Sequence, residues 1–232
     1  MIYVISDLHG YPLERVKELL NKAAFGSNDY CFVLGDVIDR GDEGIDILRW
    51  MSLQPNMELI LGNHEAMMLS NRFILDEVTD ESISSINAER ISNLSTWLSN
   101  GAQPTLNALK KLSNDQAEYI FEYIEDSSLY VTLNIDGKKF LLTHSGLGNF
   151  RSEKNLNEYT ADELLWARPQ LMYRYYDNIT TVFGHTPTLF YSDEYAGKIL
   201  TTDTWIDIDA GAACGQAPAL LRLDDLKEFY LD

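Results

Sequence analysis

The first 62 residues alternate between short apolar runs and amphipathic segments, and this alternation constrains the fold more than any other feature of the chain. Apolar runs at 2–6, 30–34 and 57–61 predict strands, while the segments 12–24 and 45–50 carry apolar residues at helical spacing. A strand–helix–strand–helix–strand order predicts parallel pairing with helical crossovers. In sheets of this kind, functional sites gather beyond the carboxyl ends of the strands.

The period changes in the middle of the chain. Residues 65 to about 127 are predicted to be mostly helical, with a capping box at 113–116. Within this region, 76–93 is acidic, rich in serine and only weakly periodic. The segment 76–100 is therefore either a mobile lid or a solvated helical insertion, and the composition favours the solvated insertion.

The second half of the chain returns to strand-like patterns. Apolar runs flank Asp136-Gly137, which is a strong hairpin signal, and later runs predict four more strands, at 181–183, 198–201, 205–208 and 219–223. No linker or internal repeat stands out. We therefore expect a single α/β (α+β) domain over 1–232, with two stacked sheets, helices outside them and a helical insertion at about 76–127.

Composition excludes several classes of function. The chain has 18 basic and 36 acidic residues, so its formal net charge of −18 disfavours a binder of nucleic acid or of an anionic membrane surface. No apolar stretch approaches the roughly 18 residues that span a bilayer, and the N-terminus does not resemble a signal peptide. Cys31 and Cys214 cannot form a disulfide framework, so we expect two reduced thiols in a cytoplasmic protein.

All four histidines of the chain fall in polar segments that follow apolar runs, each beside Gly, Asp, Asn or Ser. A single histidine at a strand end is usually a surface or core residue, but four of four are hard to explain by packing. The segments are Asp7-Leu8-His9, Gly35-Asp36-Val37-Ile38-Asp39-Arg40-Gly41, Gly62-Asn63-His64-Glu65, Thr143-His144-Ser145-Gly146 and Gly184-His185-Thr186.

These side chains suit divalent metals such as Mn, Fe or Zn. Asp7 and His9 would face the same side if the first strand continued through them. Asp36 follows the neighbouring strand and is the natural bridge between two cations, while Asn63 adds a neutral oxygen donor. Two metals about 3.5–4 Å apart would clamp a phosphate and lower the pKa of a shared water.

A second group of residues suits proton transfer and phosphate binding. His64, placed just outside the metal shell with Asp39 accepting from its other nitrogen, would be an oriented general acid. The guanidinium of Arg40 could bind two phosphate oxygens. A turn-stabilising ion pair would be the simpler explanation of Asp39-Arg40 if no metal site lay beside it.

The ordered motifs resemble those of the phosphoprotein phosphatase family, whose pattern is D-x-H, G-D-x-x-D-R-G, G-N-H-[DE] and two later histidines. The match runs from Asp7 to His185, and the compact length is similar to that of the bacteriophage lambda-type and bacterial protein phosphatases. The resemblance implies a calcineurin-like metallophosphoesterase fold, a β-sandwich of two mixed sheets flanked by helices. It also implies two divalent ions per chain, most simply Mn, with Fe, Zn or Ni as alternatives.

The same resemblance assigns roles to residues. It implies one metal held by Asp7, His9 and Asp36, and a second held by Asp36, Asn63, His144 and His185. It makes His64 the general acid, Asp39 its partner and Arg40 a phosphate ligand, with Asn63 also near the phosphate. Arg168, after Leu164-Leu165-Trp166, resembles a second phosphate-binding arginine, although Arg174 lies nearby and a surface role for Arg168 competes.

The implied activity is hydrolysis of a phosphomonoester on a protein or peptide, serine/threonine first and tyrosine second, by a hydroxide that the two metals activate. Symmetrical bis(5'-nucleosyl)-tetraphosphate hydrolysis is the close alternative, but its enzymes resemble G-D-x-x-A-R-G where this chain keeps Asp39. Cyclic-nucleotide phosphodiesterases end in G-H-x-H, and Pro187 stands at that last position here. A non-catalytic metal-binding module predicts loss of the acid or of a ligand, and none is lost. The oligomeric state cannot be derived from these patterns.

Overall fold

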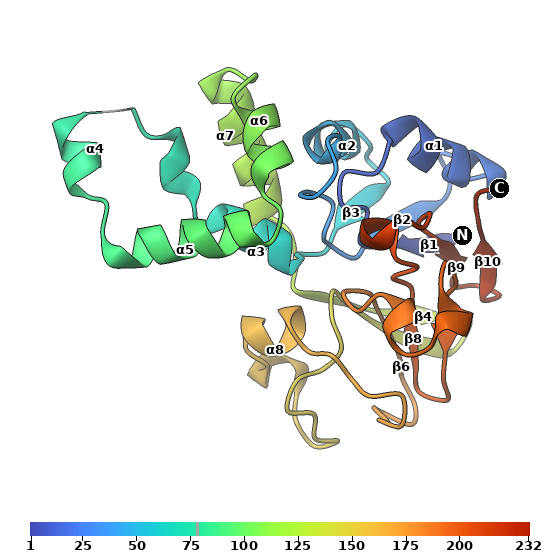
Figure 1. Ribbon diagram of the computed structural model, residues 1–232. Helices are drawn as coiled ribbons and strands as arrows, with labels where there is room; N and C mark the ends of the chain where they lie inside the picture. The colour runs from blue at the N-terminus through green and yellow to red at the C-terminus, as the bar shows by residue number, and fades with distance from the viewer. Residues whose placement is uncertain (78) are drawn as a thin grey trace.

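Three parallel strands at the start of the chain form the centre of the first sheet in a computed structural model that describes residues 1–77 and 79–232 (Figure 1). They are β1 (Ile2–Ile5), β2 (Tyr30–Val33) and β3 (Met57–Leu59), and the crossovers between them are α1 (Leu13–Lys22) and α2 (Gly44–Met51). The predicted order of strands and helices is confirmed. Each crossover brings the chain back to the same sheet edge, so the three strand ends lie together.

Two strands from the C-terminus complete this sheet. β9 (Leu220–Arg222) pairs antiparallel with β1, and β10 (Lys227–Phe229) pairs antiparallel with β9, which gives the order β10-β9-β1-β2-β3. The sequence predicted β9 but not β10. Two of the three residues of β10 are charged, so its pattern carries no hydrophobic signal, and only pairing with β9 makes it a strand.

The second sheet is also mixed, with the order β4-β5-β6-β8-β7. β4 (Tyr130–Ile135) and β5 (Lys138–Thr143) form the predicted hairpin, in which Ile135 lies opposite Lys138. β5 then pairs parallel with β6 (Thr180–Phe183), and β6 pairs parallel with β8. The strand at the far edge, β7 (Leu200–Thr201), is antiparallel to β8 (Trp205–Asp207).

Alternation along the strands builds a core on both faces of each sheet. In β1, Val4 faces the second sheet and packs in one buried cluster with Phe140 and Val182, whereas Tyr3 and Ile5 face the layer of helices. A third buried cluster lies on the outer face of the second sheet. The two mixed sheets therefore pack against each other with helices outside, as the sequence predicted.

The helical region between β3 and β4 extends away from the sheets, and Figure 1 shows α4 at its far end and α5 running back from there to α3. Its helices are α3 (Asn63–Leu69), α4 (Asp80–Ser84), α5 (Ala88–Ser99), α6 (Gln103–Leu109) and α7 (Asn114–Glu125). The capping box at the start of α7 is present, with Ser113 accepting from the Gln116 amide. The expected helical insertion at 76–127 is thus observed, although residue 78 lies outside the described residues.

The remaining elements are short, and most of them follow a strand of the second sheet. They are α8 (Ala161–Leu165) and the 3-10 helices η1 (Arg72–Leu75), η2 (Leu156–Glu158), η3 (Thr188–Phe190), η4 (Asp193–Tyr195) and η5 (Ala212–Cys214). The buried side of α8 packs on the second sheet through Leu164. These elements matter mainly because α8, η3 and η5 stand around the ends of β6 and β8.

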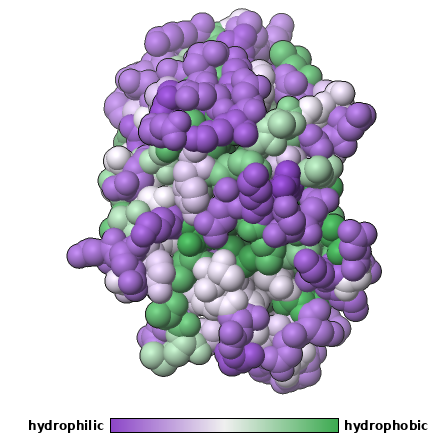
Figure 2. Space-filling view, turned by 90° about the vertical axis from the view of Figure 1, so that its right-hand side faces the viewer, coloured by the Kyte–Doolittle hydropathy of each residue, from purple (hydrophilic) through white to green (hydrophobic). Residues whose placement is uncertain are grey.

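The surface opposite the helical insertion is mixed in character. Figure 2 shows hydrophilic side chains over most of the upper part of this face and apolar side chains gathering lower down. Of the helices that the structure describes, none combines the length and apolar character needed to cross a bilayer. Both cysteines are free, Cys31 buried and Cys214 exposed.

Candidate active site

One cavity of about 210 Å³ opens where the strand ends of the two sheets meet. Its walls include seven of the ten residues that the sequence singled out: His9, Asp36, Arg40, Asn63, His64, Arg168 and His185. The other three, Asp7, Asp39 and His144, are at most 1% exposed and contact the wall residues from behind. The folded chain therefore brings the whole predicted set together from segments up to 178 residues apart.

The loops after β1 and β2 have left-handed backbone rather than continuing the strands. Asp7 and His9 have φ of 51° and 43°, and Asp36 has φ of 54°. The expectation that Asp7 and His9 share a side by strand alternation is therefore wrong, because β1 ends at Ile5. Hydrogen bonds between loops hold the strained turns, with the amide of His9 donating to the carbonyl of Asp36 at 2.9 Å.

Glu65 fixes the loop that carries Asp36. Its buried carboxylate accepts from three successive amides, those of Asp36 and Val37 at 2.8 Å and that of Ile38 at 3.3 Å. Consecutive amides that point at one anion form a rigid nest. In the sequence, Glu65 is only the last position of a motif, and its acidic character beside His64 is the one signal of this role.

The hydrogen bonds of two histidines set their tautomers. Nδ1 of His144 lies 2.7 Å from the carbonyl oxygen of Leu34, and Nδ1 of His9 lies 3.1 Å from that of Ile38. A carbonyl oxygen can only accept, so both Nδ1 atoms carry the hydrogen. The Nε2 lone pairs of both rings are then directed toward Asp36, as in histidines that bind metals.

Asp36 lies at the centre of the candidate ligands. Two groups, Asp36 with His144 and His185, and Asp36 with His9 and His64, each have ligand atoms within 4.8 Å of one another. Nε2 of His144 lies 3.4 Å from Oδ1 of Asp36, and Nε2 of His9 lies 3.7 Å from Oδ2. The two carboxylate oxygens thus face different histidines, which is the arrangement expected of a bridge between two cations.

Asn63 and Asp7 stand at the two sides of this centre. Oδ1 of Asn63 lies 2.8 Å from Nε2 of His144, so the amide oxygen joins the group around His185. Asp7 is less simple: its Oδ2 accepts the amide hydrogen of His185 at 2.9 Å, and its Oδ1 is buried without a hydrogen-bond partner. Oδ1 is therefore the oxygen of Asp7 that a cation could bind without competing with a hydrogen bond.

The donor set fits divalent metal ions. Nε2 of His144 and Nδ1 of His185 approach to 3.2 Å, and the other ring nitrogen of His185 is buried without a partner. Burial raises the pKa of Asp36 and of Asp7 well above the ordinary value and lowers that of His9 well below it, so each charged form needs compensation. A cation among these groups would give the orphaned Oδ1 of Asp7 a partner and would neutralise the buried carboxylates.

His64 and Asp39 form the predicted pair at the edge of this centre. Nδ1 of His64 lies 2.6 Å from Oδ2 of Asp39, and Nη2 of Arg40 lies 3.2 Å from the opposite ring nitrogen. A guanidinium only donates, so Nε2 accepts and Nδ1 donates to Asp39. Burial raises the pKa of Asp39 to about 6 and lowers that of His64 to about 3, which leaves a neutral imidazole beside an ionised carboxylate at neutral pH.

The structure separates the two candidate arginines. Arg168 follows α8, lines the cavity and donates to the carbonyl of His185 at 3.1 Å. Arg174 is exposed and pairs with Asp203 and Asp177 instead. Of the two, Arg168 is therefore the one whose guanidinium can reach a phosphate in the cavity.

Two buried carboxylates were missed. Asp209 lies in the cavity wall, and burial raises its pKa to about 7, with Asp36 adding to the effect. Behind it, Oδ2 of Asp207 is buried without a partner. The signal was present in the sequence, because two acids interrupt the apolar run of β8 and its extension to Ile208, and an acid in a buried strand needs an explanation.

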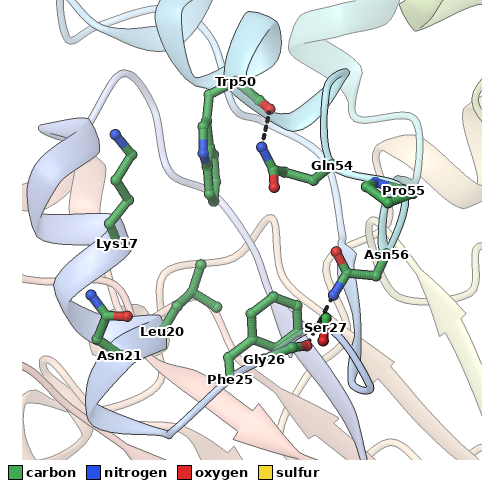
Figure 3. A pocket seen from close by; sticks show the side chains of 10 residues that line it. All are labelled: Lys17, Leu20, Asn21, Phe25, Gly26, Ser27, Trp50, Gln54, Pro55 and Asn56. Atoms are coloured by element: carbon green, nitrogen blue, oxygen red, sulfur yellow. Dashed lines mark hydrogen bonds between the residues drawn. The ribbon is translucent and has the colours of Figure 1, made fainter.

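Another hollow, of about 340 Å³, lies between α1 and α2 (Figure 3). Leu20, Phe25 and Trp50 line it with Lys17 and several side-chain amides, two of which, those of Gln54 and Asn56, donate to backbone carbonyls. Among the described residues, its lining includes no histidine or carboxylate, so it holds none of the candidate metal ligands.

Known proteins share this fold and much of this sequence pattern. A family model described as calcineurin-like phosphoesterase matches residues 1–208. Serine/threonine-protein phosphatase 2 of Salmonella typhimurium is 23% identical over 220 residues, which is 92% of this chain and 88% of that protein.

Shorter matches have higher identity. Symmetrical bis(5'-nucleosyl)-tetraphosphatases are 31% identical over 100 residues in Psychromonas ingrahamii, and 37% over 71 residues in Buchnera aphidicola subsp. Schizaphis graminum. These cover 41% and 30% of this chain, and 36% and 26% of the relatives. The chain thus matches only about a quarter to a third of the length of these curated tetraphosphatases.

Solved structures agree with the fold. A crystal structure provisionally named a diadenosine tetraphosphatase superposes with a TM-score of 0.65 at 14% identity, covering 99% of this chain and 92% of that one. A protein serine/threonine phosphatase from Saccharomyces cerevisiae gives 0.60 at 15% identity, covering 100% and 80%. At such low identity the likeness establishes the shared architecture and leaves the substrate open.

Proposed function

The chain belongs to the calcineurin-like phosphoesterase family, and we propose that within this family it is a serine/threonine protein phosphatase that also accepts phosphotyrosine. The single observation that carries the proposal is the hydrogen-bonded His64–Asp39 pair beside two candidate ligand groups that share Asp36. Such a pair has a use where a leaving oxygen must be protonated, as in hydrolysis of an alkyl phosphate. The similarity to a serine/threonine phosphatase over nearly all of both chains supports the same substrate class.

We assign the metal ligands as the sequence predicts. Asp7, His9 and Asp36 would hold one divalent ion, and Asp36, Asn63, His144 and His185 the other, with Mn²⁺ as the preferred metal. When bound, the two ions would supply Lewis acidity to the phosphate and lower the pKa of a water molecule held between them.

The side chains around the centre then divide the remaining work. Arg40 and Arg168 lie in the wall of one cavity, where their guanidinium groups can hold phosphate oxygens. Asn63, assigned above to the second metal, also lines this cavity and would contact the phosphate. To act as the acid, His64 has to carry a proton on Nε2 as well as on Nδ1, whereas in the chain without metal or phosphate its Nε2 accepts from Arg40. The ionised carboxylate of Asp39 keeps the ring oriented and would stabilise this imidazolium form, which would give its Nε2 proton to the departing oxygen.

The two arginines and the metal ions also explain how an acidic chain can bind a phosphorylated substrate. A formal charge of −18 is spread over the whole molecule, and solvent screens charges more than about 10 Å apart at ordinary ionic strength. Inside the cavity, cations lie close to the phosphate and dominate its energy. We further propose a cytoplasmic location, which the two free cysteines support.

The second candidate function is symmetrical cleavage of dinucleoside tetraphosphates. It is favoured by the 31–37% identity of the tetraphosphatase matches, although these cover less than half of this chain. Asp39 argues against it, because those enzymes resemble a pattern with alanine at the corresponding place. Phosphatases and tetraphosphatases share the scaffold, so the two functions are distinguished by which substrate the chain hydrolyses.

Phosphate release with added Mn²⁺ tests the proposal, comparing a phosphoserine peptide, a phosphotyrosine peptide, p-nitrophenyl phosphate and diadenosine tetraphosphate. We expect hydrolysis of the first three and complete loss after chelation. His64→Asn should lower kcat for the phosphoserine peptide by about 10²–10⁴-fold. Preferential cleavage of diadenosine tetraphosphate would transfer the assignment to the second candidate.

A further inference from the structure

The turn that carries Asp39 and Arg40 depends on the helical insertion for both of its amide partners. Asp39 and Arg40 have φ of 69° and 68°, which side chains rarely adopt. The amide of Asp39 donates to Oγ1 of Thr105 in α6 at 2.9 Å, and the amide of Arg40 donates to the carbonyl of Gly101 at 2.9 Å. Because a strained turn persists only where its surroundings hold it, residues 97–105 belong to the support of the site.

The carboxylate of Asp39 receives two of its three side-chain hydrogen bonds from the same segment. Oδ2 accepts from Nε1 of Trp97 in α5 at 2.8 Å as well as from His64 at 2.6 Å. Oδ1 accepts from the hydroxyl of Thr105 at 2.6 Å. The Thr105 hydroxyl thus joins the amide and the carboxylate of one residue, which fixes χ1 of Asp39 as well as its backbone.

Burial makes the loss of any of these hydrogen bonds costly. Asp39 and Trp97 are fully buried and Thr105 is 2% exposed, so water cannot replace a missing donor. Along the chain these residues are 58 and 66 positions from Asp39, and they come from two helices of the insertion. Figure 1 shows that the insertion otherwise projects away from the sheets, so its inner end is the part that meets the site.

We propose that Trp97 and Thr105 are positioning residues for the general acid, acting through Asp39 on the orientation of the His64 ring. The inference rests on the proposed function, in which His64 protonates the leaving oxygen. Neither residue lines the cavity, so neither touches the substrate. The helical insertion is then a working part of the site, because it supplies two of the three donors that hold the acid's partner.

The proposal predicts an effect that depends on the leaving group. A phosphoserine ester leaves as an alkoxide and needs its proton, whereas p-nitrophenolate is a stable anion that leaves without one. If the His64 ring is poorly oriented, hydrolysis of the first substrate must suffer more than hydrolysis of the second. A general loss of packing or of metal would slow both substrates alike.

The experiment compares kcat for a phosphoserine peptide and for p-nitrophenyl phosphate in the Mn²⁺-loaded full chain. Thr105→Val removes the hydroxyl with little change in shape, whereas Trp97→Phe removes the indole N–H together with part of a fully buried side chain. We expect kcat for the peptide to fall by about 10–100-fold and kcat for p-nitrophenyl phosphate by less than about threefold. Thr105→Ser, which keeps the hydroxyl, should restore the ratio of the two rates to that of the wild-type chain.

Matched controls remove comparable groups elsewhere. Thr181→Val deletes a buried hydroxyl whose oxygen has no hydrogen-bond partner, and Trp205→Phe deletes a buried indole N–H that donates to the carbonyl of Tyr173. Neither control should change the ratio of the two rates. Melting curves and bound metal are measured for every variant, and Thr105→Val decides alone if Trp97→Phe does not fold.

The outcomes separate this inference from the proposed function. Equal loss on both substrates, no loss on either, or the same change of ratio in a control overturns the positioning role while the phosphatase assignment stands. A wild-type chain that hydrolyses neither phosphomonoester defeats the proposed function itself. A selective loss on the peptide that serine at position 105 reverses supports the inference.

Discussion

The two sheets contribute to the same cavity by different means. In the first sheet, three parallel strands end together, and the residues that follow β1 and β2 lie in left-handed turns bonded to each other, as between His9 and Asp36, while β3 leads into α3. In the second sheet, the histidines are fixed by bonds to the first: Nδ1 of His144 to the carbonyl of Leu34, and the amide of His185 to Asp7. The loops after β1 and β2 bond to each other, whereas His144 and His185 of the second sheet are held by hydrogen bonds to the first sheet.

This difference indicates how the work is divided. The first sheet supplies the shared carboxylate of Asp36, the His64–Asp39 pair and one arginine, whereas the second supplies two imidazoles and, from the loop after α8, Arg168. Residues of the first sheet should therefore control whether the reaction occurs at all. Residues of the second sheet should control how tightly metal and phosphate are held.

The largest expected loss of activity follows removal of the carboxylate of Asp36, which both candidate ligand groups share. Asp36→Asn should lower kcat by more than about 10³-fold, because both cations lose an anionic ligand. His185→Asn in the second sheet should weaken Mn²⁺ binding while leaving measurable activity at saturating metal. Titration calorimetry and phosphate release measure the two effects, with exposed Asp42→Asn as the control. Activity of Asp36→Asn within tenfold of the wild-type chain would contradict the shared role.

Substitution of the two arginines should have smaller effects, on kcat for Arg40 and on KM for Arg168. Arg40 contacts His64 and belongs to the turn after the first sheet, so Arg40→Ala should lower kcat by about 10²-fold. Arg168→Ala should mainly raise KM, by about tenfold, because its guanidinium holds phosphate without touching the acid. Steady-state kinetics separate the two, and Arg174→Ala should stay within about twofold of the wild-type chain. The idea fails if both arginines change only KM.

The buried acids of the second sheet predict a pH effect on the metal-free protein. The pKa of Asp209 is raised to about 7, so between pH 4 and 7 the folded state binds this proton more tightly than the unfolded state. Its contribution to stability is fully present below about pH 4 and is lost as the pH rises toward 7. In Asp209→Asn the amide oxygen can still accept from Gly211. Between pH 4.5 and 7.5, the free energy of unfolding of this variant should therefore rise by roughly 2–4 kcal/mol relative to that of the wild-type chain.

Urea denaturation of both chains at the two pH values measures this difference in the free energy of unfolding. The histidines contribute equally in both chains, so their opposite effect on stability cancels. Burial lowers the pKa of His9, His64 and His185, which would otherwise make stability rise with pH over part of the same range. Saturating Mn²⁺ should reduce the gain, because cations compensate the carboxylates. A gain that is equal at pH 4.5 and 7.5 would show that Asp209 is not the destabilising group.

Much of this arrangement could be predicted from the sequence, because polar motifs at the ends of apolar runs report sheet edges directly. The histidines, Asp36 and the His64–Asp39 pair are local signals of that kind. The partners of Asp39 are not, since Trp97 and Thr105 reach it only through the packing of α5 and α6 and have ordinary helical surroundings in the sequence. Asp209 was missed for another reason, because it lies just beyond the strand recognised at 205–208 and its acid was not questioned.

Close packing of neighbouring loops leaves no room for a side chain at two glycines beside the site. A Cβ at Gly184 would stand 2.0 Å from Oδ2 of Asp7, and one at Gly62 would stand 2.3 Å from the amide nitrogen of Asp36. In contrast, Gly137 in the β4–β5 turn has open space around it and only its φ of 84° to satisfy, which asparagine can do. Even alanine would therefore clash at positions 62 and 184, whereas position 137 at the hairpin tip has room for a side chain.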